Sequence, residues 1–226
     1  MTFREVETLF HEFGHGLQHM LTQMEYADVA GINGIEWDAV EIPSQMMENF
    51  CYDKDTIAAI SGHYKTGESL PNDLFEKLKA SRNFMIATGM LRQLGLGALD
   101  MYLHSHYSFT HEPLFAAQQR LLAEYTVLSP LKDDRFLCSF AHIFAGGYAA
   151  GYYSYKWAEI LSCDAYGAFK EAATDGPQAV ARVGLKFRET ILARGGGQHP
   201  EQVFEAFRGR KPSMVPLLTQ YDLVDK

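Results

Sequence analysis

The sequence predicts a mainly α-helical protein that forms one domain. Apolar residues recur at spacings of three and four along most of the chain, which is the period of a helix with one buried face. No convincing stretch alternates apolar and polar residues as a half-buried strand does. The chain has 226 residues, of which 47% are hydrophobic and 21% charged, so it is long enough to build a substantial core. These observations favour a single globular helical domain.

The first predicted helix spans residues 2–24. Thr2 and Glu5 fit a capping box, in which each side chain accepts a hydrogen bond from a backbone amide at the helix start. The helix is therefore expected to begin near Thr2. Its apolar positions have helical spacing and are Phe3, Val6, Phe10, Phe13, Leu17, Met20, Leu21 and Met24.

The other predicted elements are also helices. A glycine-bearing loop over residues 27–37 precedes a helix near Glu41 that carries Pro43 in its first turn. Asn72 or Asp73 is suited to cap a long helix, and the glycines at 195–197 form a strong stop signal. The predicted helices after the first cover residues 41–50, 55–64, 74–104, 113–125, 151–173, 177–194, 200–207 and 212–221.

Charge and hydropathy narrow the function classes. The formal net charge of −8 disfavours a nucleic-acid surface, which needs a basic face to neutralise phosphates. No run of about 18 apolar residues exists that could cross a membrane. The first residues form a motif-bearing helix rather than a signal peptide. We therefore expect a cytoplasmic protein that binds neither nucleic acid nor membranes.

The three cysteines favour a reduced protein. Cys51, Cys138 and Cys163 are odd in number, widely spaced and set among apolar residues. This pattern suits buried thiols better than a disulfide framework or a thiolate metal cluster.

The most specific feature is the pentapeptide His11-Glu12-Phe13-Gly14-His15. On a helix, residues four apart share a face, so both imidazoles can reach one metal ion. Glu12 lies beside the first histidine, where it can act on a metal-bound water. This is the H-E-x-x-H arrangement of zinc hydrolases. Gly14 and Gly16 weaken the helix, and we expect them to serve close packing or room beside the metal.

A hydrolytic zinc site needs a third protein ligand. Glu41, at the start of the second predicted helix, ranks first, because a second helix crossing the first could complete a site of two histidines and one glutamate. Glu36, Asp38 and Glu48 are nearby alternatives that spacing alone does not exclude.

Three separated segments, residues 9–15, 40–46 and 142–157, resemble the thimet oligopeptidase family of zinc metallopeptidases, in particular its bacterial oligopeptidase A branch. The resemblance covers essentially the whole chain and implies a zincin-like catalytic domain over residues 1–226 with one zinc ion. It implies that Glu41 is the third ligand, after His11 and His15. It also suggests Glu36 or Asp38, with Glu7 as a further candidate, as groups that orient a ligand histidine.

The resemblance also assigns roles near residue 150. It implies that Tyr155, Tyr148 and His142 contact the substrate or the developing oxyanion, and that Tyr152 contacts the substrate. Gly146 and Gly147 form a glycine hinge that would let a substrate-binding loop close. The remaining aromatic residues of this segment, Tyr153 and Trp157, are expected in the core.

The predicted reaction is hydrolysis of short peptides. Zinc lowers the pKa of its water, and Glu12 takes a proton from that water and later passes one to the leaving amine. Family members carry several hundred residues before the zinc motif, so the expected partner is a missing N-terminal helical region of the same protein. The alternative is a truncated, inactive module that binds zinc or self-associates.

Arg208 and Arg210 are expected on the surface, with binding of a peptide carboxylate as their alternative role.

Overall fold

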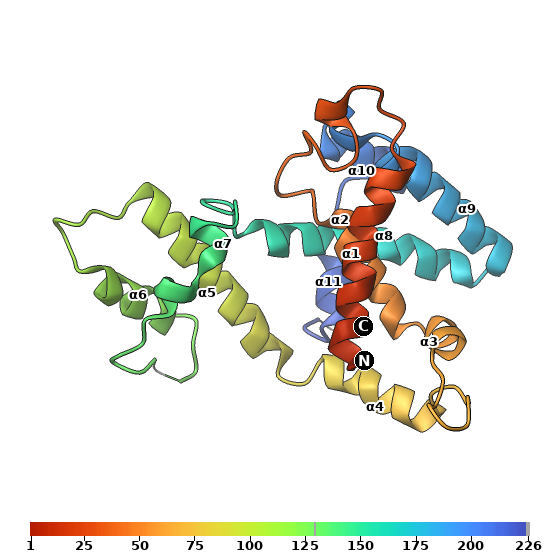
Figure 1. Ribbon diagram of the computed structural model, residues 1–226, viewed down its shortest axis with the longest axis horizontal. Coiled ribbons are helices and arrows are strands. Elements are labelled where there is room, and N and C mark those ends of the chain that lie inside the picture. The colour runs from red at the N-terminus through yellow and green to blue at the C-terminus, as the bar shows by residue number, and fades with distance from the viewer. Residues whose placement is uncertain (129, 225–226) are drawn as a thin grey trace. The chain divides into compact units, whose positions relative to one another are not determined.

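The computed structural model describes residues 1–128 and 130–224, and these residues form helices and no strand (Figure 1). The predicted mainly α fold is thereby confirmed. The α-helices are α1 (Phe3–Leu21), α2 (Ile42–Glu48), α3 (Lys54–Ile60), α4 (Asn72–Arg82), α5 (Ile86–Ser105), α6 (Leu114–Ala123), α7 (Ala141–Phe144), α8 (Ser154–Ala173), α9 (Pro177–Phe187), α10 (Pro200–Arg208) and α11 (Val215–Gln220). Short 3-10 helices cover Ala27–Val29, Asn49–Tyr52, Phe136–Ser139 and Gly195–Gly197, and a π-helical segment covers Arg188–Leu192.

The chain forms two compact units. The first unit contains Met1–Phe84 and, among the described residues, 158–224, whereas the second contains Met85–Trp157. No helix in the described ranges combines the length and apolar content of a membrane span.

The core of the first unit is built mainly from α2, α8, α9 and α10. Ala158, Leu192 and Phe204 are almost completely buried there, and rings of Phe169, Phe187 and Phe207 pack edge-on or tilted against one another. Helix α1 lies along α2 (Figure 1), and Leu17 and Leu21 of α1 pack against this core. The Thr2 capping box is present as predicted.

A buried glutamine fixes the second half of α1. Gln18 is 1% exposed, and its Nε2 donates to the carbonyls of Ile191 at 3.3 Å and Leu192 at 3.0 Å. Those carbonyls belong to the π-helical segment, whose wider turn pairs the Ala193 amide with the Arg188 carbonyl. Because buried carbonyls need donors, Gln18 stabilises both the segment and the position of α1.

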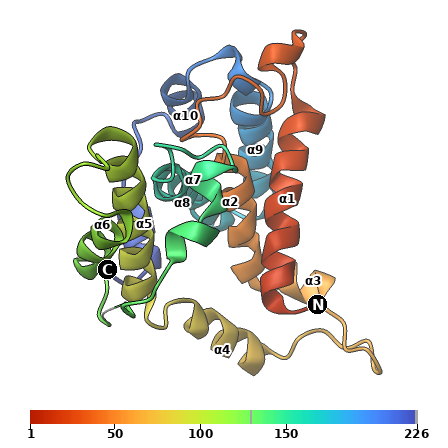
Figure 2. The same cartoon turned by 60° about the vertical axis from the view of Figure 1, so that its left-hand side comes forward.

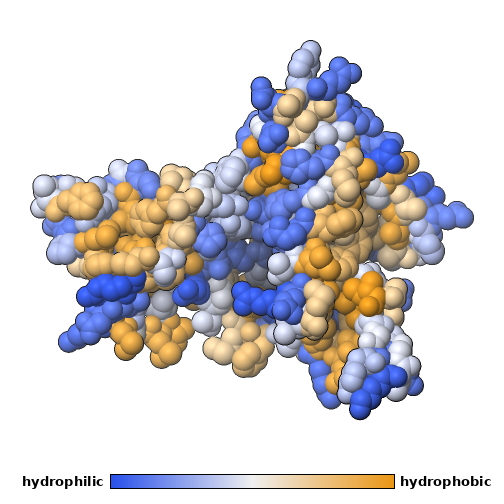
Figure 3. Space-filling model, viewed as in Figure 1, coloured by the Kyte–Doolittle hydropathy of each residue, from blue (hydrophilic) through white to orange (hydrophobic). Residues whose placement is uncertain are grey.

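The second unit packs α5 against α6, which lie side by side in Figure 2. Its core contains Leu99, Leu137 and Ile143, together with the ring of Tyr152. Apolar surface covers much of the face over α5 and α6 in Figure 3, and Leu91, Leu94 and Met101 of α5 are exposed.

Several predicted elements differ from the structure. The long helix predicted over 74–104 is wrong, because the chain breaks between α4 and α5 and Met85 has a left-handed φ of 53°. The Asn83 side chain donates to the Gln220 carbonyl and to Asp222, a tertiary contact that local sequence does not reveal. The helices predicted from residues 151 and 212 begin at Ser154 and Val215, and that predicted to residue 64 ends at Ile60.

Three burial predictions also need correction. Cys51 and Cys163 are buried as expected, but Cys138 is exposed. Tyr153 and Trp157, expected in the core, are 44% and 52% exposed, whereas Tyr152 is 8% exposed. Tyr152 and Tyr153 lie in a turn before α8, so helical spacing does not predict which of the two rings points inward, and Trp157 lies on an exposed side of the first turn of α8.

Candidate active site

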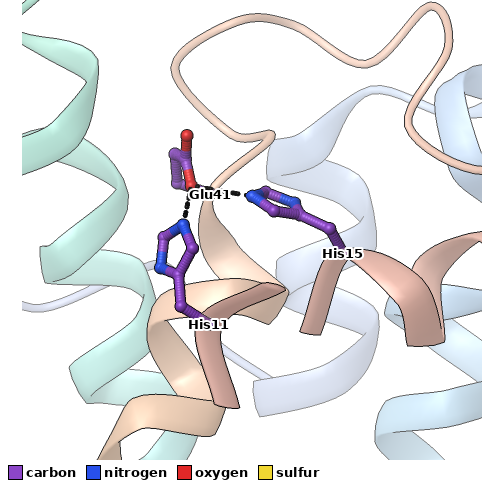
Figure 4. A group of neighbouring side chains, drawn as sticks. All are labelled: His11, His15 and Glu41. Carbon is purple, nitrogen blue, oxygen red and sulfur yellow. Dashed lines mark ion pairs between the residues drawn. The ribbon is translucent and has the colours of Figure 1, made fainter. Parts of the chain in front are cut away.

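Two helices bring the three predicted metal ligands together (Figure 4). His11 and His15 project from the same face of α1, and Glu41 is the residue that precedes α2. One carboxylate oxygen of Glu41, Oε2, lies 3.3 Å from Nε2 of each histidine. The candidate ligand atoms all lie within 4.8 Å of one another. Two histidines one turn apart on α1 and the residue that precedes α2 thus create the cluster.

Gly14 explains why the two helices approach so closely. A Cβ atom at this position would lie 2.5 Å from Ser44 Cα and 2.7 Å from the Pro43 carbonyl oxygen. Both atoms belong to the backbone of α2 and cannot rotate away. A residue with a side chain would therefore push α2, and with it Glu41, away from the histidines.

Ser44 orients the Glu41 carboxylate. Glu41 is 3% exposed and Ser44 is completely buried. The Ser44 hydroxyl lies 2.8 Å from Glu41 Oε2 and 3.0 Å from the Glu41 carbonyl oxygen, so it can donate to either acceptor. Burying a carboxylate without partners is costly, and this hydroxyl, with the two facing histidines, offsets part of the cost.

Glu48 is the carboxylate that orients His11. His11 Nδ1 lies 2.6 Å from Glu48 Oε1, and because an ionised carboxylate only accepts, the ring must carry a proton on Nδ1. The other nitrogen, Nε2, faces Glu41. The sequence indicated Glu48 only as an alternative ligand. Its position seven residues after Glu41, two helical turns along α2, is the signal that could have placed it opposite α1.

Two of the three groups that were predicted to orient a ligand histidine, Glu7 and Glu36, contact other residues. Glu7 accepts a hydrogen bond from the Tyr52 hydroxyl at 2.7 Å. Glu36 lies 3.8 Å from His199, and its side chain is 44% exposed. Asp38 is half-buried in the turn before α2.

The carboxylates change the electrostatics of His11. Burial would lower its pKa, but hydrogen bonds to Glu41 and Glu48 raise the pKa to about 10. Metal binding requires a neutral imidazole, so a proton and a metal ion compete for Nε2. His15 Nδ1 is buried, and no hydrogen-bond partner for it exists within the described part of the chain.

The donor set fits zinc. Ligands about 2.0–2.2 Å from a tetrahedral zinc lie roughly 3.3–3.6 Å from one another. Each histidine Nε2 lies at 3.3 Å from Glu41 Oε2. Two imidazoles and one carboxylate also match the His2Glu sets of catalytic zinc sites, which keep a fourth position open. Glu12, next to His11 on α1, is exposed and able to meet a molecule from solvent.

The other predicted site residues form an aromatic cluster within the second unit. The ring of His142 lies 6.2, 5.8 and 6.1 Å from the rings of Tyr148, Tyr152 and Tyr155. Tyr148 and Tyr155 stack with ring centres 4.6 Å apart. The Tyr152 hydroxyl donates to Gln93 at 3.0 Å, which places this ring in the unit's core.

The two glycines that were predicted to form a hinge, Gly146 and Gly147, lie between His142 and Tyr148. A Cβ atom on Gly146 would meet His142 Cα at 2.9 Å and the His142 carbonyl oxygen at 3.0 Å, so only glycine fits there without a shift. Gly147 has a left-handed φ of 85°. Both glycines therefore have a conformational reason that is independent of substrate.

The two arginines considered for peptide binding pair with acids instead. Arg208 and Arg210 both bond to Asp164, which is completely buried, and Arg208 also pairs with Glu171. The Arg208 side chain is only 8% exposed, so its predicted surface position is wrong. Asp164 also accepts from the Ser213 amide and so ties the C-terminal segment to α8.

The chain is similar to known oligopeptidases over nearly its whole length. The Peptidase family M3 model matches residues 1–223. The chain is 56% identical to both the Organellar oligopeptidase A, chloroplastic/mitochondrial, and the Probable cytosolic oligopeptidase A of Arabidopsis thaliana, each over 99% of its length. It is 48% identical to Oligopeptidase A of Haemophilus influenzae over 96% of its length. These matches cover 28%, 32% and 31% of the respective relatives, so the chain spans about a third of their length. Since the family model covers nearly all of the chain and extends across both units, the chain belongs to peptidase family M3.

Proposed function

We propose that this chain carries the zinc-binding and catalytic part of a metalloendopeptidase that hydrolyses short peptides. The observation that carries the proposal is the convergence of His11, His15 and Glu41, with Glu12 beside the first ligand. The family membership supports a peptidase. Zinc, when bound, would supply Lewis-acid chemistry: it polarises an oxygen atom that approaches it and makes water easier to deprotonate.

The chain's own residues then divide the work. His11, His15 and Glu41 would hold one zinc ion, with Glu48 and Ser44 keeping the ligand groups in orientation. The Glu12 carboxylate accepts a proton from the attacking water and passes one to the nitrogen of the leaving amine. The reaction needs no covalent enzyme intermediate, because water adds directly across the peptide bond.

The second unit would supply donors and substrate contacts. The hydroxyls of Tyr155 and Tyr148 and the ring of His142 are proposed to donate to the carbonyl oxygen as it gains negative charge. Tyr152 is proposed to contact the substrate together with the residues that surround its ring. Gly146 and Gly147 are proposed as the hinge of the substrate-binding segment. The family resemblance, together with the clustering of these four rings, supports these roles.

Location and partners are proposed with the function. We propose a cytoplasmic protein that binds neither membranes nor nucleic acid, and one similar protein is named as cytosolic. In a full-length form, further chain would restrict the substrates to short peptides, in line with the greater length of the relatives. Cell fractionation tests the location, and recovery in an organelle would contradict it.

The test is cleavage of a quenched fluorescent peptide of about eight residues by the zinc-loaded chain, with and without chelator. We expect cleavage that chelator abolishes, and a Glu12→Gln variant that keeps its zinc but loses activity. Equal turnover by Glu12→Gln and the parent protein would refute the mechanism. A folded, zinc-loaded chain without activity would favour the alternative of a truncated zinc-binding module.

A further inference from the structure

A completely buried carboxylate in the second unit touches the loop that leads to the tyrosines. Asp100, on α5, has no exposed surface. Its Oδ1 accepts from the Ala150 amide at 2.9 Å, and its Oδ2 accepts from the Tyr152 amide at 2.8 Å. His104, one turn along the same helix, lies beside this carboxylate: its Nδ1 is 2.8 Å from Oδ1 but hydrogen-bonds to the Asp100 backbone carbonyl at 3.0 Å. Both carboxylate oxygens are thus engaged, and the loop contacts cross 50 and 52 residues of sequence.

The loop needs such support because one of its residues adopts an unfavourable backbone conformation. Ala150 has a left-handed φ of 53°, a conformation that residues with a Cβ rarely adopt. The Ala150 amide is one of the two that Asp100 holds. Charge-assisted hydrogen bonds to a carboxylate are stronger than neutral ones, so they can hold this turn in place.

The anchored residues determine where the rings lie. Tyr152 follows the turn at Ala150 and places its ring 5.8 Å from His142 and 5.2 Å from Tyr155. At the other end of the loop, the Tyr148 amide donates to the His142 carbonyl at 2.9 Å. The segment between Tyr148 and Tyr155 is therefore fixed near both ends, by a backbone bond and by Asp100.

We propose that Asp100 is a positioning residue for the reaction. Its carboxylate fixes the loop over residues 146–153 in the conformation that gathers Tyr148, Tyr152 and Tyr155 around His142. The consequence for catalysis rests on the proposed function, whereas the anchoring of the loop does not.

The first experiment measures backbone amide exchange in the 226-residue chain by NMR. In Asp100→Ala we expect the amides of Ala150 and Tyr152 to exchange about tenfold faster or more, because both lose a charged acceptor. Nuclear Overhauser effects between the stacked rings of Tyr148 and Tyr155 should also weaken. Unchanged exchange at both amides would overturn the anchor.

A further variant separates positioning from general loss of structure. Asp134 is a matched control, because in the same unit it accepts from the Phe136 amide and from Gln118 Nε2 without contacting the loop. Asp134→Ala should leave exchange at Ala150 and Tyr152 unchanged. Equal loss in Asp134→Ala would show a nonspecific effect and contradict the proposal.

The catalytic consequence has its own readout. For zinc-loaded protein that cleaves peptide, Asp100→Ala should lower kcat about ten- to a hundredfold with zinc affinity unchanged, because misplaced donors stabilise the transition state poorly. Faster exchange with unchanged kcat would refute positioning for catalysis while leaving the anchor in place. A parent chain that lacks activity would count against the proposed function, and the exchange data would still decide the anchor.

Discussion

The candidate metal cluster rests on two helices, whereas two rings of the aromatic cluster in the second unit, Tyr148 and Tyr152, lie on the loop between α7 and α8. His11 and His15 are held by one turn of α1, and Glu41 by the start of α2. In the second unit, the turn at Ala150 depends on a carboxylate 50 residues earlier in the chain. Helical placement is stiff and local, whereas loop placement relies on distant hydrogen bonds. The two clusters should therefore respond to different mutations.

The largest expected difference concerns the tyrosines. Tyr155→Phe removes one hydroxyl from the second unit and leaves all proposed zinc ligands intact. We expect turnover to fall about a hundred- to a thousandfold, the usual cost of losing an oxyanion donor, with zinc affinity unchanged. Steady-state kinetics and competition with a chromophoric chelator measure the two quantities. A parallel loss of zinc would mean that the clusters are not independent.

The converse change removes the ligand carboxylate. Glu41→Gln should weaken zinc binding more than about a hundredfold, beyond the usual cost of losing an orienting partner. Glu36→Gln is the matched control, since this exposed carboxylate lies outside the cluster. Equal zinc affinity for Glu41→Gln and the parent chain would exclude Glu41 as a ligand.

The orienting role of Glu48 predicts a smaller effect on the same quantity. Glu48→Ala should lower zinc affinity about ten- to a hundredfold, because His11 loses the acceptor that fixes its tautomer and ring orientation. Glu7→Gln should have little effect, because Glu7 bonds to Tyr52. The reverse order of the two variants, measured by calorimetry, would contradict the structural assignment.

The close approach of α1 and α2 predicts the smallest effect. Gly14→Ala should lower the free energy of unfolding by about 1–3 kcal/mol, because its Cβ meets fixed backbone atoms of α2. Gly16→Ala, whose Cβ would lie 4.0 Å from the flexible Met20 side chain, should instead raise it by about 0.5–1 kcal/mol. Denaturant unfolding measures both, and equal shifts would show that helix propensity, not packing, decides the outcome.

The same contrast explains what the sequence could predict. The spacing of His11 and His15 is a property of one helix, so it predicts their shared face directly. The identification of Glu41 as a ligand depended on the position of a second helix. Sequence spacing alone left Glu36, Asp38 and Glu48 as alternatives. The hydrogen bond from His11 to Glu48 was not predicted, although the position of Glu48, two helical turns after Glu41, indicated it.

The loop of the second unit was much less predictable. Its tyrosines were identified through family resemblance, and helical spacing misplaced Tyr153 and Trp157 with respect to the core. Asp100 carries no local motif, because its partners are backbone amides far along the chain. The break between α4 and α5 was missed for the same reason, since the Asn83 side chain bonds to residues near the C-terminus.

X-ray absorption at the zinc edge, on the chain loaded with one equivalent of zinc, tests the central claim most directly. We predict a first shell of nitrogen and oxygen atoms at about 2.0–2.2 Å, with the multiple scattering of two imidazoles, and a changed shell in Glu41→Gln. A sulfur shell at about 2.3 Å, or a spectrum that Glu41→Gln leaves unchanged, would contradict a site made by His11, His15 and Glu41.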